Sequence, residues 1–119
     1  MSDYDDIIQG GIWQVSDAPS VELVKWWVFE TPEGDHHFNG YNITVGEGRV
    51  SSKIVEFDMA TKTGITRSGR KYTLAGIPAY HSDAAYVLDA WLRINSLTRD
   101  QIKDATGEYL TENEKQILS

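Results

Sequence analysis

Residues 49–74 constrain the fold more than any other stretch, because they read as apolar runs interrupted by a tight turn. Apolar and polar residues alternate in the first run, which is the period of a half-buried strand. Apolar side chains recur along the stretch at Val55, Phe57, Met59, Ile65, Tyr72 and Leu74. Ser68-Gly69 stands where a two-residue hairpin turn would join the last two strands. We therefore expect about three strands here, in the middle of an antiparallel sheet with one covered face.

Residues 21–30, VELVKWWVFE, carry the strongest strand signal, because β-branched and aromatic residues dominate them. Strict alternation would divide the apolar residues between two faces, with Leu23, Trp27 and Phe29 on one and Val24, Trp26 and Val28 on the other. Such a strand is central and covered on both sides, or one of its faces meets a partner. Residues 35–45 are expected to pair back as the next strand, with a bulge at Gly40 and an end at Val45.

The C-terminal third has the period of helices. Residues 82–97 predict a helix from Ser82, as N-cap, to Leu97. Its apolar stripe consists of Ala84, Val87, Leu88, Trp91 and Leu92. We expect this stripe to pack on one sheet face, with Trp26 or Trp27 against Trp91, because large aromatic side chains need a buried partner.

Two capping boxes follow this helix. Thr98 and Gln101 predict a short helix that runs to Thr106 and stops at Gly107, and Thr111 with Glu114 predicts a last turn or two. The expected fold is therefore α+β: a five- to six-stranded antiparallel sheet followed by C-terminal helices. At 119 residues the chain is one domain, residues 1–119. Residues 1–11 are expected to be frayed, and residues 107–119 to be weakly ordered or a short helix.

Composition and charge exclude several functions. The chain has no cysteine, which excludes disulfides, thiolate metal sites and cysteine nucleophiles. No apolar run could span a bilayer, and the acidic start is unlike a signal peptide, so we expect a cytoplasmic protein without a membrane association. The net charge is −7: residues 1–48 carry one base and nine acids, residues 49–71 six and two, and residues 72–119 four and seven. Such an acidic chain is a poor general nucleic-acid binder, although the basic middle allows a local exception.

Histidines offer the one candidate for catalysis or metal binding. Asp35, His36 and His37 are consecutive, and His81 precedes the expected helix. Adjacent residues of a strand point to opposite faces, so His36 and His37 should not bind one ion together. We therefore predict no tight transition-metal site and no cofactor. The alternative is a small hydrolase or metal-dependent enzyme that uses His36, His37 and His81.

Two other groups are candidate binding surfaces. Four bases, Lys62, Arg67, Arg70 and Lys71, surround the expected hairpin turn, where they could bind an acidic partner or simply keep an edge solvated. The aromatic residues Trp13, Trp26 and Trp27 could form an exposed patch, although core packing is the commoner role of tryptophan. The doubled tryptophan places one indole away from the helix-covered face, which would suit a dimer or a partner.

These features favour a small, non-enzymatic, acidic binding protein that acts through a protein–protein interface. By analogy, it could be a bacterial or phage accessory protein that antagonises a nucleic-acid-handling complex, since acidic faces fit basic grooves. A second alternative is a structural homo-oligomer that uses the tryptophan-bearing sheet face.

Overall fold

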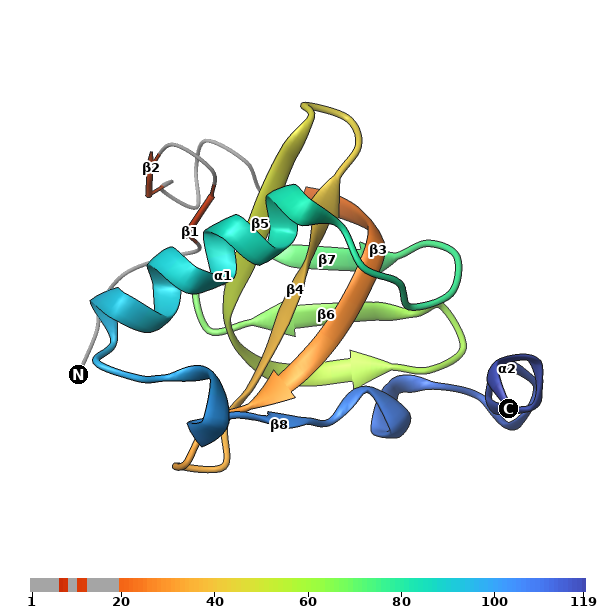
Figure 1. The fold of residues 1–119 in the computed structure, drawn as a ribbon. Helices are drawn as coiled ribbons and strands as arrows, with labels where there is room; N and C mark the ends of the chain where they lie inside the picture. Colours follow the sequence, from red (N-terminus) through yellow and green to blue (C-terminus); the bar gives the residue numbers. More distant parts are fainter. Residues whose placement is uncertain (1–6, 9–10, 13–19) are drawn as a thin grey trace.

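The structure is a computed structural model that describes residues 7–8, 11–12 and 20–119, and it confirms the α+β class (Figure 1). In chain order the elements are β1 (Ile7–Ile8), β2 (Gly11–Ile12), β3 (Ser20–Glu30), β4 (His36–Asn42), β5 (Glu47–Asp58), β6 (Thr63–Thr66), β7 (Lys71–Leu74), α1 (Ser82–Ile94), the 3-10 turn η2 (Arg99–Gln101), β8 (Lys103–Asp104), the 3-10 turn η3 (Thr106–Tyr109) and α2 (Glu112–Leu118). Among these described elements, five strands have four residues or more, and β1, β2 and β8 have two each.

The five longer strands pair into a closed ring. β3, β4, β5, β6 and β7 follow one another as antiparallel neighbours, and β7 then pairs with β3 in parallel. β5 can take part on both sides because its first half pairs with β4 and its second half with β6. The sheet is therefore mostly antiparallel but mixed, and the parallel closure is a feature that the sequence pattern did not predict. Figure 1 shows α1 lying across β4 and β5, with β6 and β7 behind them.

A bulge in β3 decides which side chains face the inside of the ring. The pairing of β3 with β4 shifts between Val24 and Trp27, and Lys25 has a φ of 48°. The extra residue reverses the alternation, so Leu23 faces the same side as Trp26 rather than the side of Trp27, and that part of the prediction is wrong. The predicted bulge lies on β3 opposite Gly40, where a Cβ would come within 3.0 Å of the Cβ of Trp26.

Each face of β3 has its own apolar core. The first core fills the ring with Val21, Leu23, Trp26, Val28, Phe38, Tyr72 and Leu74, and Ala105, Tyr109 and Leu110 close it. The second core lies under α1 and contains Phe29, Val50, Val87, Leu88, Trp91 and Leu92. The prediction that α1 packs on one sheet face is thus confirmed. The partner of Trp91 differs from the expectation: its ring contacts Phe29 and His37 at centroid distances of 5.2 and 4.7 Å. Trp27 packs against this second core under α1, whereas Trp26 belongs to the first core, inside the closed ring of strands.

The helix ends differ from the sequence prediction in detail. His81, one residue before Ser82, is the N-cap of α1, because its Nδ1 accepts a hydrogen bond from the Asp83 backbone N–H. α1 ends at Ile94 with Asn95 as C-cap, short of Leu97. The capping box of Thr98 forms as predicted but opens a single 3-10 turn, since β8 then pairs with the end of β3.

The end of β4, the hairpin between β6 and β7 and the start of α2 can also be compared with the sequence predictions. Ile43 and Val45 are exposed because β4 ends at Asn42, before the expected end of the strand. The hairpin between β6 and β7 lies where predicted, but its loop has four residues, 67–70, rather than two, with Gly69 at a φ of 88°. α2 begins at the predicted capping box of Thr111, so the chain end is a short helix. Residues 1–11 were expected to be frayed, and most of them lie outside the described part. No helix among the described residues is long and apolar enough to cross a membrane.

Candidate functional site

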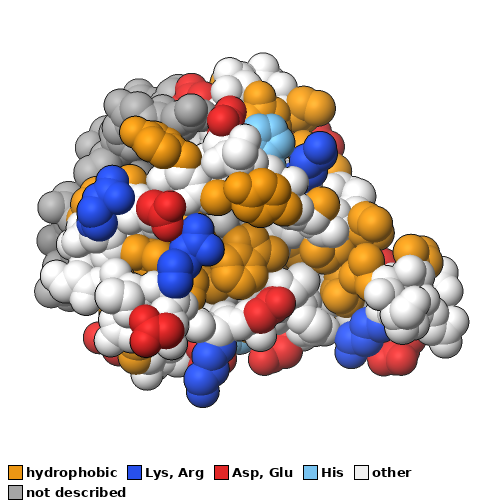
Figure 2. Space-filling model, viewed as in Figure 1, with side chains coloured by type: hydrophobic (Ala, Val, Ile, Leu, Met, Phe, Trp, Pro, Cys, Tyr) orange, Lys and Arg blue, Asp and Glu red, His pale blue; other side chains and the backbone are white. Residues whose placement is uncertain are grey.

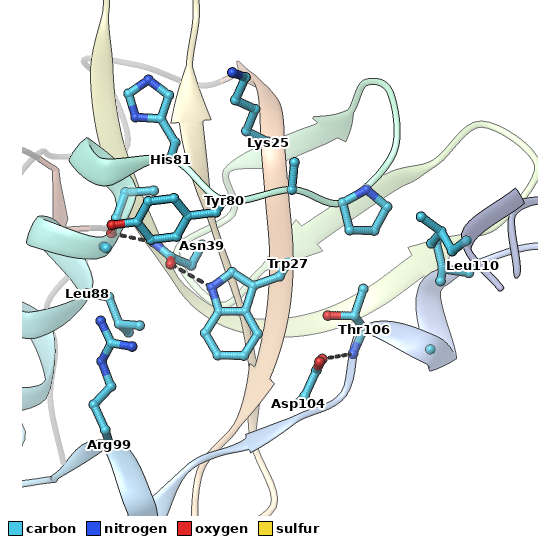
Figure 3. A pocket seen from close by; sticks show the side chains of 16 residues that line it. Lys25, Trp27, Asn39, Tyr80, His81, Leu88, Arg99, Asp104, Thr106 and Leu110 are labelled. Atoms are coloured by element: carbon cyan, nitrogen blue, oxygen red, sulfur yellow. Dashed lines mark hydrogen bonds between the residues drawn. The ribbon is translucent and has the colours of Figure 1, made fainter.

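A pocket of about 540 Å³ opens between α1, the middle of β3, residues 78–81 and the η3 segment (Figure 3). Its lining is mainly apolar, and Figure 2 shows that hydrophobic side chains gather across this face of the molecule. A pocket of this size is typical of sites that enclose a small molecule or a side chain of a partner.

The floor of the pocket is a tryptophan held by a buried amide. The Trp27 indole Nε1–H donates to Asn39 Oδ1 at 2.7 Å. Asn39 is 1% exposed, and its Nδ2 donates to the carbonyls of Arg49 and Ala84, each at 3.0 Å. These three hydrogen bonds join β3, β4, β5 and α1 at one point. The half-buried Trp27 ring is therefore fixed before any ligand arrives, which lowers the entropy lost on binding.

The rim consists of the exposed side chain of Tyr80 and of residues 78–81, whose backbone is hydrogen-bonded to β3. Tyr80 is 76% exposed and lies beside Trp27 at the mouth of the pocket (Figure 3). The backbone N–H of Ala79 donates to the Trp26 carbonyl at 3.3 Å, which ties residues 78–81 to β3. The His81 ring stacks on Tyr41 with centroids 3.9 Å apart. The rim thus offers aromatic surface on a backbone that is already positioned.

Three residues of the lining carry a full charge. Arg99 donates from Nε to Asp89 at 3.1 Å, in an ion pair with both side chains half exposed. Asp104 accepts from the Thr106 backbone N–H at 2.9 Å. Lys25 is exposed and forms no ion pair with any other residue that the structure describes. Lys25 is therefore the cation of this pocket that no acid among the described residues pairs with.

The two tryptophans predicted as a binding patch have different environments. Trp27 lines the pocket, whereas Trp26 is 0% exposed and donates from Nε1 to the Gly76 carbonyl at 3.1 Å. The prediction of an exposed surface is therefore wrong for Trp26, because the bulge directs it into the ring. The homo-oligomer through the tryptophan-bearing sheet face stays a prediction. Trp13 lies outside the described residues.

The four predicted bases do not form one surface. Lys62 lies in the turn between β5 and β6, whereas Arg67, Arg70 and Lys71 lie at the other end of β6. Arg67 and Lys71 are exposed, but Arg70 is 0% exposed. The expectation of an exposed basic hairpin is therefore wrong for Arg70, because the domain encloses this side chain.

The three histidines occupy three separate places. His36 contacts the Tyr109 hydroxyl at 2.7 Å and Glu30 Oε1 at 3.0 Å, so both of its ring nitrogens are engaged. His37 is stacked on Phe29 on the side of α1, so the two adjacent rings do turn to opposite sides as predicted. Burial, and then the charge of Glu108, raises the pKa of Tyr109 to about 12, so its hydroxyl stays protonated.

One described group could hold a metal ion, and the sequence did not indicate it. Possible ligand atoms of Glu30, His36 and Glu108 lie within 4.8 Å of one another. The hydrogen bond of His36 to Glu30 accounts for the approach of those two side chains. The expectation of no tight metal site remains a prediction.

Lys62 links the ring of strands to α2. Its Nζ donates to the Tyr109 carbonyl and to Glu114 Oε1, the latter at 2.9 Å, and it lies 5.2 Å from the centre of the Trp26 ring. The pKa of Glu114 is the result of opposing effects: burial raises it, but hydrogen bonds from Lys62 and from the Thr111 backbone, with the Lys62 charge, lower it below 4.5 overall.

This lowered pKa predicts a pH dependence of stability. A carboxylate whose pKa falls on folding stabilises the protein above its unfolded pKa, and that contribution is lost as the pH falls through the folded value. Glu114→Gln should therefore reduce the free energy of unfolding by about 1 kcal/mol at pH 7. The difference from the wild type should shrink as the pH falls below 4.5. Urea titrations at several pH values measure it, and Glu112→Gln is the control, because that side chain is 89% exposed. An equal pH profile for both variants would contradict the assignment.

The sequence reasoning found Trp27 but missed Lys25, Asn39 and Tyr80. An aromatic residue between Pro78 and a helix start is a usable signal for Tyr80, because such a loop position leaves the ring exposed. No local pattern brings residues 25, 39 and 80 together. Comparison with protein-family models, with curated proteins and with solved structures finds no match to this chain.

Proposed function

We propose that this chain is a small, non-enzymatic binding protein whose pocket over Trp27 receives an apolar side chain of a protein partner. The observation that carries the proposal is the half-buried Trp27 ring, which Asn39 fixes as the floor of a pocket with the exposed Tyr80 at its rim. Aromatic side chains in a preformed pocket are the usual anchors of protein interfaces. The proposal keeps the protein–protein interface predicted from the sequence and moves it to this pocket.

The polar groups of the lining favour binding over catalysis. His81 Nδ1 already accepts a hydrogen bond as the N-cap of α1, and Asp104 accepts one from Thr106. Arg99 is paired with Asp89. A general acid–base pair needs two groups that reach one reacting atom, and these groups are instead engaged in local structure.

The surroundings of the pocket favour a protein over a nucleic acid. The apolar lining includes Tyr80, Leu110 and Leu118, and Ile117 of α2 continues this apolar surface beyond the pocket. Leu118 and its neighbour Ile117 are 44% and 65% exposed. Apolar surface that continues beyond a pocket suits a peptide chain, whereas a net charge of −7 opposes contact with phosphates.

A peptide-display selection tests this proposal. Immobilised full-length protein is exposed to a random heptapeptide library, and enrichment is compared with that on two variants. Tyr80→Ala removes the rim, and Gly107→Phe adds a ring at the mouth of the pocket, where a Cβ would meet no atom within 4 Å. Tyr86→Ala is the matched control, because this tyrosine is 64% exposed on α1 but does not line the pocket.

We expect peptides with aromatic or large aliphatic residues to be enriched on the wild type and on Tyr86→Ala. Enrichment should be lost on Gly107→Phe and reduced on Tyr80→Ala. If Gly107→Phe enriches the same peptides as the wild type, the pocket is not the binding surface and the proposal is wrong. Thermal unfolding of each variant verifies that the fold is retained.

A further inference from the structure

We infer that the partner segment carries an acidic side chain within two residues of its apolar anchor, and that Lys25 binds this acid. The inference rests on the function proposed above, because it assigns the charge of the peptide that the pocket takes. It is carried by the position of Lys25 and by the balance of charges around the pocket.

Lys25 is placed at the pocket by the β-bulge. It precedes Trp27 by two residues on β3, and its φ of 48° is uncommon for a residue with a side chain. Figure 3 shows Lys25 at one end of the pocket and Asp104 at the other, with Trp27 between them. A non-glycine residue held in this conformation is a recurrent feature of binding sites, where the surrounding structure compensates for the strain.

The charges of the pocket leave one cation without an internal partner. Among the described residues Asp89 pairs with Arg99, while Lys25 forms no ion pair. Asp104, the acid of the lining, lies at the far end and accepts from Thr106. The end of the pocket at Lys25 is therefore positive, although the chain as a whole has a net charge of −7. This local positive charge favours a negative group of the ligand at that end.

The spacing limits where this negative group can lie. Residues of an extended chain advance by about 3.3 Å each, and the positive φ of Lys25 shortens the chain there, so the Cα atoms of Lys25 and Trp27 lie no farther apart than two residues of an extended strand. A peptide that places an aromatic or aliphatic side chain over Trp27 would bring the next one or two positions to Lys25. An Asp or Glu there would gain a charge-assisted hydrogen bond from the ammonium group.

The selection described above tests this inference when it includes two further variants. Lys25→Asp reverses the charge and Lys25→Asn removes it, and both residues tolerate a positive φ better than other side chains. On the wild type, enriched peptides should contain Asp or Glu within two positions of the apolar residue. On Lys25→Asp the apolar residue should persist, while the acid is replaced by Lys or Arg.

A second measurement gives the size of the effect. The peptide most enriched on the wild type is synthesised with a fluorophore, and its dissociation constant is measured by polarisation. Lys25→Asn should weaken binding about fivefold, as expected for one exposed charge pair. The loss should shrink at 0.5 M salt, because exposed charges are screened. Lys71→Asn, a change at an exposed lysine outside the pocket, should leave the constant unchanged.

The outcomes separate this inference from the proposed function. If the wild type and Lys25→Asp enrich the same apolar peptides without a charge preference, the inference is wrong and the proposed function stands. If neither enriches peptides beyond Gly107→Phe, both are wrong. Phenylacetate serves as the probe for a small aromatic acid: tighter binding of phenylacetate than of any selected peptide would also overturn the inference.

Discussion

Trp26→Ala is expected to lower the free energy of unfolding by about 3–5 kcal/mol, the range for large aromatic residues of a core. Trp26 is 0% exposed at the centre of the ring of strands. The substitution would remove the hydrogen bond from its indole to the Gly76 carbonyl and the contact of the ring with Lys62. Gly40 lies against the Trp26 backbone, so this strand pair cannot move much closer to fill the space. Urea unfolding followed by fluorescence of the remaining tryptophans measures the loss.

Trp27→Ala is the matched control, because the two tryptophans are adjacent in sequence but lie on opposite faces of β3. Trp27 is half buried and its ring faces the pocket, so less apolar area is lost. Leaving the Asn39 amide without its indole donor adds a cost, and we expect a total of about 2 kcal/mol. A larger loss for Trp27 than for Trp26 would mean that the bulge does not direct Trp26 into the core.

Sequence pattern predicted those parts of the fold that depend on local chemistry. Strands, turns and caps arise from neighbouring residues, so the capping boxes at Thr98 and Thr111 could be identified without the structure. The packing of α1 on the sheet follows from one apolar stripe. The predicted helix from Thr98 to Thr106 does not form beyond one 3-10 turn, because Lys103 and Asp104 pair with the end of β3. A pairing with a strand more than 70 residues earlier leaves no local signal in the sequence.

The prediction of which side chains share a face of β3 was wrong because of one inserted residue. Alternation predicts both faces of a strand from any one position, so one inserted residue reverses every later assignment. In β3 this residue lies at Lys25, which has no glycine beside it to mark a bulge. Leu23 was therefore assigned to the wrong face, and Trp26 was considered for a surface that it does not reach.

The candidate pocket could be predicted in part only. Trp27 was among the predicted binding residues, but the pocket exists because residues 25–27, 78–81 and 104–110 come together through the ring of strands. Asn39 is a polar residue of a strand in sequence and becomes the support of the site only through contacts with Arg49 and Ala84. The role of Asn39 depends on residues that are distant in the chain, so neither composition nor local pattern predicts it.

The second large effect is expected at Arg70, where the sequence predicted a surface residue and the structure buries the side chain completely. Arg70→Glu would place a carboxylate where a guanidinium is enclosed by the domain. A buried charge without its complement costs about 3–5 kcal/mol, so we expect this variant to be largely unfolded or severely destabilised. Arg67→Glu, three residues earlier in the same hairpin, changes an exposed side chain and should cost less than about 1 kcal/mol.

The two variants distinguish a buried arginine from a solvated hairpin edge. Both change the net charge by the same amount, so a general effect of charge on stability would shift both midpoints of urea unfolding equally. A loss confined to Arg70→Glu locates the effect in burial, because Gly69 and the two strands of the hairpin are the same in both proteins. Equal and small shifts would mean that Arg70 reaches solvent, and the hairpin would then return to the role predicted from the sequence, that of an exposed basic edge open to an acidic partner.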